Sequence, residues 1–254
     1  MNRVVIITQN DPFFLKKNIQ WLWENFPSGC EISGVVMLEA SPFGKRLGFI
    51  SKVYETWRIF GLSFVARYGI RFLLSKIFSG DVYSFLKSKG IPIISLTKNI
   101  NSEESIVKIK DMNPDLLVSI AGNEIFKKNL IDLAPNGCLN LHSSLLPLYR
   151  GLMPSFWVLK NKEKKSGVSV FYVDDGIDSG PIIIQKKFDI LGLSQQELIE
   201  KSKSIGMQAI VEALIAIRDS SVTIIENDHN SMTYYSFPTR EDVKEFIKAG
   251  ARFF

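Results

Sequence analysis

The sequence is poor in the residues that hold metal ions or covalent cross-links. It has two cysteines and two histidines among 254 residues. Cys30 and Cys138 make neither a disulfide framework nor a metal-ligand spacing, which fits a reducing cytoplasm. His, Cys and carboxylate residues do not cluster at ligand spacing, so we predict no metal site.

Long hydrophobic runs are also missing. No apolar stretch approaches the roughly 18 residues that a membrane span needs. The first apolar run, residues 4–8, is too short for the core of a signal peptide. Hydrophobic residues make up 46% of the chain and charged residues 22%, which is typical of a soluble globular protein. We therefore expect a cytoplasmic protein without a transmembrane span.

Glycine is absent where a phosphate-binding loop would need it. Residues 8–12, after the first predicted strand, read Thr-Gln-Asn-Asp-Pro. This excludes both the dinucleotide-binding fingerprint and a Walker loop at that position.

Strand and helix signals alternate along the chain. Strands are predicted at residues 4–8, 32–37, 91–95, 116–120, 137–141 and 182–188, and amphipathic helices at residues 14–26 and 195–218. The alternation predicts an α/β, Rossmann-like fold whose mostly parallel sheet has helices on both faces. Ligands of such folds bind at the carboxyl ends of the strands.

We expect a catalytic domain over residues 1–190 and a short C-terminal α/β extension, mainly helical, over residues 191–254. In this extension a Thr-x-x-Asp capping box precedes a last amphipathic helix. That helix is expected to bury Val243, Phe246 and Ile247.

The most informative segment is residues 139–151, Leu-Asn-Leu-His-Ser-Ser-Leu-Leu-Pro-Leu-Tyr-Arg-Gly. Asn140 and His142 lie two residues apart, so at a strand end their side chains project from one face. Asp178 follows in a second Gly-rich turn between apolar runs. A neutral imidazole can accept a proton from an attacking amine, a carboxylate can orient it, and an amide can donate to an oxyanion. These three residues favour acyl transfer to nitrogen without a covalent enzyme intermediate.

The motifs around these residues resemble the signature of the formyltransferases that use 10-formyltetrahydrofolate. They are Asn140-x-His142-x-Ser144-Leu145-Leu146-Pro147, Tyr149-Arg150-Gly151-x-x-Pro154, Gly167-Val168 and Asp175-Gly176-Ile177-Asp178-Ser179-Gly180. The strong resemblance covers about residues 114–190. It implies a folate-dependent N-formyltransferase with Asn140, His142 and Asp178 as catalytic residues. A structural role for each motif alone is the alternative.

The resemblance also implies where 10-formyltetrahydrofolate, the co-substrate, binds. The implied contacts are Glu124, Ile125, Phe126, Ser144, Leu145, Leu146, Pro147, Asp174, Asp175, Gly176 and Ile177. Alternatively, Ile125 and Phe126 only anchor a helix to the sheet.

The acceptor amine is chosen by elimination among the family's substrates. Residues 8–12 lack the glycine-rich loop of glycinamide ribonucleotide enzymes, and the sequence after Asp219 leaves no room for the barrel of methionyl-tRNA enzymes. We therefore expect a nucleotide-linked amino sugar as the acceptor. The alternatives are a methionyl-tRNA formyltransferase without the barrel, a formyltetrahydrofolate hydrolase, and an inactive folate-binding or docking module.

Residues 44–80 are a basic, aromatic insertion with seven Lys or Arg residues and one acidic residue, Glu55. Six side chains recur at helical spacing, namely Val53, Trp57, Phe60, Phe64, Tyr68 and Phe72. Gly61 and Gly69 make two broken helices as reasonable as one long helix. The stripe favours packing on the sheet or on a second subunit of a homodimer. The alternatives are binding of a diphosphate through Arg67 and Arg71, docking on an anionic membrane, and contact with nucleic acid, which is the least favoured.

Overall fold

The computed structural model describes residues 2–39, 48–78, 80–96 and 98–254. Its strands are β1 (Asn2–Gln9), β2 (Cys30–Leu38), β3 (Ile93–Ser95), β4 (Leu116–Ile120), β5 (Cys138–His142), β6 (Arg150–Gly151), β7 (Lys165–Tyr172), β8 (Ile182–Asp189) and β9 (Tyr234–Tyr235). Its helices are α1 (Leu15–Glu24), α2 (Phe49–Phe60), α3 (Leu62–Phe78), α4 (Val82–Ser88), α5 (Glu103–Lys110), α6 (Lys128–Ile131), α7 (Pro154–Lys160), α8 (Gln195–Arg218) and α9 (Arg240–Lys248).

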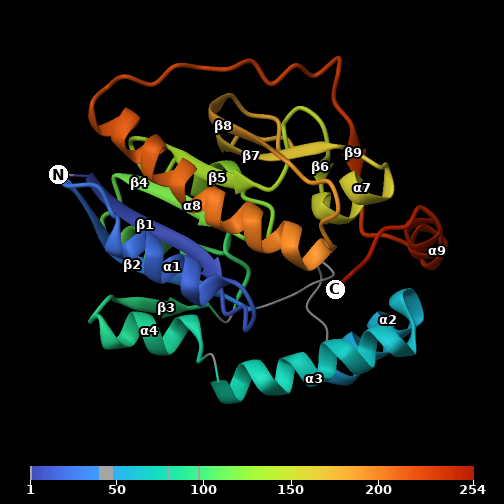
Figure 1. Cartoon of the computed structure of the whole chain (residues 1–254). Coiled ribbons are helices and arrows are strands. Elements are labelled where there is room, and N and C mark those ends of the chain that lie inside the picture. The colour runs from blue at the N-terminus through green and yellow to red at the C-terminus, as the bar shows by residue number, and fades with distance from the viewer. Residues whose placement is uncertain (1, 40–47, 79, 97) are drawn as a thin grey trace.

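The main sheet has seven strands in the order β3-β2-β1-β4-β5-β7-β8 (Figure 1). The first five strands of this order are parallel, whereas β7 and β8 are antiparallel to their neighbours. A short parallel pair, β6 with β9, forms a second sheet. The predicted fold class, α/β with a mostly parallel sheet, is confirmed.

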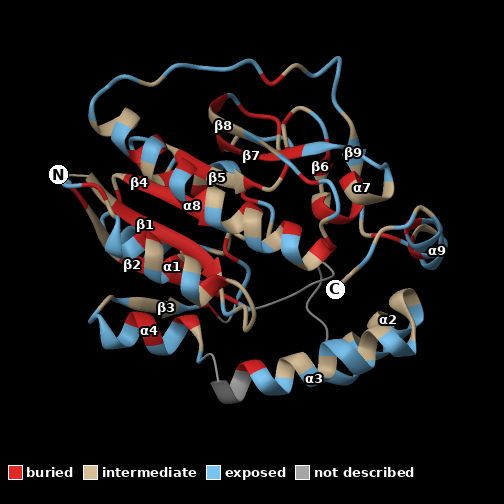
Figure 2. Ribbon diagram, viewed as in Figure 1, coloured by how far each residue is buried: buried red, intermediate tan, exposed pale blue. Residues whose placement is uncertain are grey.

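Both faces of the sheet are buried because successive residues of a strand point to opposite sides. Val4 and Ile6 of β1 pack in one cluster with α1, α4 and α8, and Val5 and Ile7 pack in another with α5 and α6. Figure 2 shows the buried residues concentrated in the central strands and in the helix faces that cover them. No described helix is long and apolar enough to cross a bilayer.

Helix α8 is part of the main core. It begins at a capping box, in which Ser194 accepts from the main chain of Glu197 and the Glu197 carboxylate accepts from Ser194. Met207, Ile210 and Leu214 then pack in the same cluster as β1 and β7. The main sheet and the predicted C-terminal extension therefore share one hydrophobic core.

Helix α9 buries two of the three residues predicted for it. Val243 and Phe246 are buried, but Ile247 is 59% exposed, so its predicted burial is wrong. Each residue turns about 100° around the helix axis, and the residue after Phe246 therefore points away from the interface. Phe246 stacks on Phe156 of α7, with ring centroids 4.7 Å apart.

The basic insertion forms two helices, α2 and α3, that break at Gly61. This glycine has φ +86°, a conformation that other residues rarely adopt. Gly69, the second predicted break, lies inside α3. Gly44, Lys45 and Arg46, at the start of the predicted insertion, lie outside the described residues.

Candidate active site

Asn140 and His142 lie on β5, and both side chains line the same cleft. Strand alternation aims them in one direction. Asn140 pairs in register with Ser119 of β4 and with Phe171 of β7. This register fixes the position of Asn140 relative to the two neighbouring strands. His142 is the last residue of its strand and is 7% exposed. The sheet therefore presents an amide and an imidazole together at its carboxyl end.

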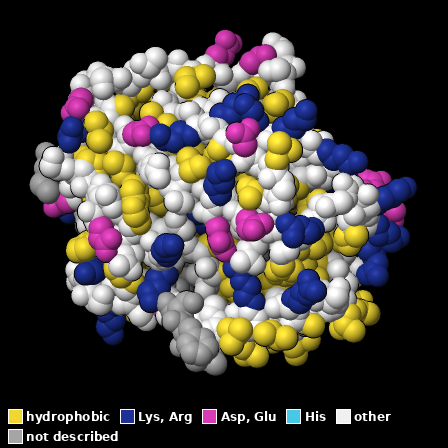
Figure 3. All heavy atoms as spheres, viewed as in Figure 1, with side chains coloured by type: hydrophobic (Ala, Val, Ile, Leu, Met, Phe, Trp, Pro, Cys, Tyr) yellow, Lys and Arg dark blue, Asp and Glu magenta, His cyan; other side chains and the backbone are white. Residues whose placement is uncertain are grey.

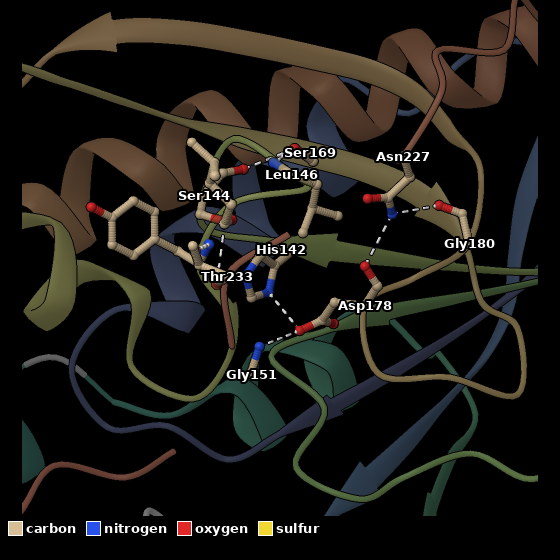
Figure 4. Close-up of polar contacts among 11 residues, drawn as sticks. His142, Ser144, Leu146, Gly151, Ser169, Asp178, Gly180, Asn227 and Thr233 are labelled. Carbon is tan, nitrogen blue, oxygen red and sulfur yellow. Dashed lines mark hydrogen bonds and ion pairs between the residues drawn. The ribbon is translucent and has the colours of Figure 1, made fainter. Parts of the chain in front are cut away.

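The main chain sets the tautomer of His142. Its Nε2 lies 2.8 Å from the carbonyl oxygen of Tyr149, which can only accept a hydrogen bond. Nε2 therefore carries the hydrogen, and the lone pair of the neutral ring is on Nδ1. This Nδ1 lies 3.4 Å from Oδ2 of Asp178 (Figure 4).

Asp178 comes from the turn between β7 and β8, with φ at +49°. Its Oδ2 accepts a hydrogen bond of 2.8 Å from the main-chain N–H of Gly151. The same oxygen faces His142, so one donor holds the carboxylate against the ring. The structure thus brings the three predicted catalytic residues to one wall, although Asp178 lies 36 positions after His142 in the sequence.

Asn227 supports the turn from the far side. Its Nδ2 donates to the carbonyl oxygens of Asp178, at 3.0 Å, and Gly180, at 2.8 Å. The buried guanidinium of Arg150 in turn donates to Oδ1 of Asn227 at 2.7 Å. A buried cation and a buried amide therefore hold the main chain that carries Asp178. The sequence analysis missed Asn227, because one asparagine in a polar loop gives no signal of its own.

The cleft in front of these residues has a volume of about 1660 Å³. Its lining includes residues 121–127, the turn at Gly176 and Ile177, and one face of α8. Asn123 adds a buried Oδ1 that has no hydrogen-bond partner among the described residues. The wall that carries Asn140, His142 and Asp178 therefore opens onto this cleft.

The residues predicted to contact folate divide into two groups. Those that line the cleft are Glu124, Ile125, Phe126, Gly176 and Ile177. Those that do not line it are Ser144, Leu145, Leu146, Pro147, Asp174 and Asp175. Ile125 and Phe126 lie in the loop before α6, outside any helix; Phe126 is buried and Ile125 is 69% exposed.

The loop after His142 supports the site from behind. Ser144 is buried, and its hydroxyl donates to the carbonyl oxygen of Leu148 at 2.8 Å. The main-chain N–H of Leu146 donates to Ser169 on β7. Leu145 packs over Gly167, where a Cβ atom would overlap it. This packing explains why glycine occupies position 167.

The inner face of the insertion also lines the cleft. Phe60 and Phe64 stack with centroids 4.7 Å apart, and both rings meet Phe253 edge-on. Arg67 and Arg71 are not among the lining residues. Arg71 instead lies over the rings of Phe13 and Phe14 and pairs with Glu200 at 3.5 Å. Phe60 and Phe64 thus pack within the protein, as predicted for the stripe, whereas Val53 and Trp57 are exposed. The geometry gives no support to phosphate binding by Arg67 and Arg71.

Lys203 of α8 is a cation on the cleft wall that the sequence analysis did not select. Burial lowers the pKa of its amine, and the nearby carboxylate of Asp11 offsets part of this effect. Asp11 itself accepts from the main-chain N–H groups of Phe13 and Phe14 at the start of α1. Among the described residues, no group of three His, Cys, Asp or Glu side chains could hold a metal ion.

The similarity of this chain to known proteins extends beyond the motifs. The methionyl-tRNA formyltransferase of Kosmotoga olearia is 32% identical over 168 residues, which are 66% of this chain and 54% of that protein. The chain thus spans about half the length of the curated relatives it matches.

Two solved structures share the fold. The N-formyltransferase of Helicobacter canadensis, in complex with folinic acid and dTDP-3-aminofucose, has a TM-score of 0.61 at 18% identity over 98% of this chain and 80% of its own. Phosphoribosylglycinamide formyltransferase of Anaplasma phagocytophilum has a TM-score of 0.63 at 19% identity over 92% of this chain and 99% of its own.

The family model of the formyl transferases matches residues 79–214, more than half of the chain. The matched segment contains Asn140, His142 and Asp178. The chain belongs to the formyl transferase family.

Proposed function

We propose that this protein transfers a formyl group from 10-formyltetrahydrofolate to a primary amine. The observation that carries the proposal is the pair of His142 and Asp178, which is held by the Gly151 N–H and lies beside Asn140 in the cleft. A base, an orienting carboxylate and an uncharged amide donor are the groups that acyl transfer to nitrogen needs.

In this reaction the acceptor nitrogen adds to the formyl carbon, and the bond from that carbon to the donor nitrogen then breaks. His142 Nδ1 accepts the proton that the acceptor nitrogen loses, because Nε2 is engaged with Tyr149. Asp178 stabilises the imidazolium that forms, since its Oδ2 faces Nδ1. Asn140 donates to the oxygen that gains negative charge. The proton on His142 then passes to the departing nitrogen.

The cleft suits a folate. Residues 121–127 and the turn at Gly176 and Ile177 bring main-chain donors and acceptors to its wall, as the edge of a pterin requires. Within the part of the chain that the structure describes, the buried Oδ1 of Asn123 accepts no hydrogen bond. Phe126 and Val173 add apolar surface. We propose that these residues, more than the buried loop of residues 144–147, contact the ligand.

For the acceptor we propose a nucleotide-linked amino sugar. The Asp11 carboxylate already takes the main-chain N–H groups at the start of α1, so that helix end does not offer them to a ribose phosphate. The fold neighbours include an N-formyltransferase in complex with dTDP-3-aminofucose. Methionyl-tRNA is the second candidate, because the curated relatives above 30% identity include methionyl-tRNA formyltransferases.

The test is to follow a labelled formyl group from 10-formyltetrahydrofolate in the purified protein. The acceptors are dTDP- and UDP-linked amino sugars, methionyl-tRNA and a no-amine control. Label in an amino sugar supports the proposal, and label in tRNA selects the second acceptor. Formate release without amine, at the rate of the best acceptor, would identify a hydrolase. Folate binding without transfer to any amine would refute an enzymatic role.

A further inference from the structure

The helix pair α2–α3 has a second face, which does not line the cleft. Its inner face, which includes Thr56, Phe60, Phe64 and Phe72, lines the cleft. Most of the opposite and flanking positions are also apolar, although they face solvent. An ordinary surface helix would carry polar residues there.

The exposed apolar strip runs along both helices. It consists of Ile50, Tyr54, Trp57, Leu62, Ile70, Leu73 and Leu74. Ile50 is 83% exposed and Leu62 is 72% exposed. The spacings from Ile50 to Tyr54 and from Ile70 to Leu74 are one helical turn, so each helix presents its members on one side. Figure 3 shows hydrophobic side chains gathered at the lower edge of the molecule, over α3 and α2, with Lys and Arg side chains nearby.

The charge of the exposed side chains determines which kind of partner this outer face can bind. Among the described side chains of α2 and α3, Arg58 and Arg67 are exposed, whereas Lys52 lines the cleft and Arg71 pairs with Glu200. Glu55 is the single acidic residue of residues 49–78. The Glu55 carboxylate is bound by Arg58 at 2.6 Å, whereas Arg67 lies exposed on α3. A symmetric contact between two copies would set this positive face against itself, which is unfavourable. An anionic lipid surface supplies both an apolar layer and the opposite charge.

We propose that the outer face of α2–α3 docks the protein on an anionic lipid bilayer, with the apolar strip in the interfacial layer and the basic residues among the headgroups. The inner face of the same helices lines the cleft. A helix with its side chains is about 10–12 Å thick, so docking places the cleft one helix away from the membrane. This inference does not depend on the reaction that the cleft performs.

The test is co-sedimentation of the purified protein with vesicles. The vesicles contain phosphatidylcholine alone or phosphatidylcholine mixed with phosphatidylglycerol. We expect binding to the mixed vesicles that falls with added salt and is weak without phosphatidylglycerol. Ile70→Ser with Leu73→Ser should weaken the binding about tenfold or more. Arg67→Gln should weaken it about fivefold.

The matched control is Val107→Ser with Leu191→Ser. These residues are 55% and 69% exposed, close to the 61% and 63% of Ile70 and Leu73, but they belong to α5 and to the loop between β8 and α8. The control should bind as the unchanged protein does, and both double variants should unfold at the same denaturant concentration. Equal binding by both double variants would overturn the proposal. So would a dimer that the Ile70 and Leu73 changes dissociate, in a protein that binds no vesicles.

Discussion

The carbonyl oxygen of Tyr149 lies 2.8 Å from Nε2 of His142, and this contact determines which nitrogen of the neutral ring carries the hydrogen. Because the carbonyl needs a donor, the neutral ring keeps its hydrogen on Nε2. The lone pair on Nδ1 then faces Asp178, which becomes a hydrogen-bond acceptor once Nδ1 is protonated. The main chain of the motif loop thus prepares His142 before any ligand binds.

Replacing either member of this pair should remove catalysis and spare folding. His142→Ala and Asp178→Asn should each lower kcat by about a hundredfold to ten-thousandfold. The asparagine can still accept from Gly151 but carries no charge to stabilise the imidazolium. Formyl transfer and folate binding are measured on the same samples. Glu104→Gln, which changes an exposed carboxylate of α5, is the control and should keep a near-normal kcat. Near-normal transfer by the Asp178 variant would remove this carboxylate from the mechanism.

Asn227→Ala should disturb the turn that carries Asp178. The change leaves the buried carbonyl oxygens of Asp178 and Gly180 without this donor, at a cost of about 1–3 kcal/mol in the free energy of unfolding. We also expect a lower kcat and an altered pH profile of kcat, because Asp178 shifts relative to His142. Denaturant unfolding and kinetics are compared with Asn230→Ala, an exposed neighbour. An unchanged pH profile would mean that Asn227 supports the fold only.

Lys203 should make stability depend on pH in the alkaline range. Burial lowers the pKa of Lys203 in the folded protein, whereas in the unfolded chain it is about 10.4. Between these values the unfolded state binds more protons, so the free energy of unfolding rises with pH in that window. Lys203→Met should flatten this rise and add stability near neutral pH. The check is denaturant unfolding of both proteins from neutral pH to pH of about 10. Parallel curves would show that the amine is not desolvated.

Replacing Gly180 and Gly69 with alanine should change the stability of the protein in opposite directions. At Gly180, two residues after Asp178, a Cβ atom would overlap the carbonyl oxygen of Tyr172. Gly180→Ala should therefore destabilise the protein and reduce kcat by moving the turn. A Cβ at Gly69, inside α3, meets no atom within 4 Å, so Gly69→Ala should stabilise by about 0.5–1 kcal/mol. Thermal unfolding measures both changes, and a stable, active Gly180→Ala protein would contradict the described turn.

Strand positions were the most predictable part of the fold. The run at residues 116–120 agrees with β4, whose five residues are all buried, and the run at residues 182–188 agrees nearly with β8, which begins with three isoleucines. The closeness of Asn140 and His142 follows from the two-residue period of a strand. Ile247 was assigned wrongly because spacing alone does not show where a buried face ends.

Other parts of the site depend on tertiary contacts that a local pattern cannot contain. Asn227 reaches Asp178 from 49 residues further along the chain. Phe64 lines the cleft and packs against the ring of Phe253. The sequence around either residue does not predict this contact. Lys203 resembles any polar residue of a surface helix until the neighbouring elements enclose it. Arg150 is buried in the structure and therefore needs a partner such as Asn227, but the sequence does not show that burial.

Asn227 and β9 lie near the end of the sequence, so the ribosome synthesises them after Asp178 and the strands of the main sheet. Asn227 holds the turn of Asp178, and β9 pairs with the strand that contains Gly151. At a translation rate of about 5–20 residues per second, the ribosome adds these positions seconds after Asp178. The sheet and the first turns of α8 can already pack in that interval. A nascent chain can therefore form its hydrophobic core before the carboxylate of Asp178 is held in place against His142. We expect formyl transfer only after most of the chain has folded.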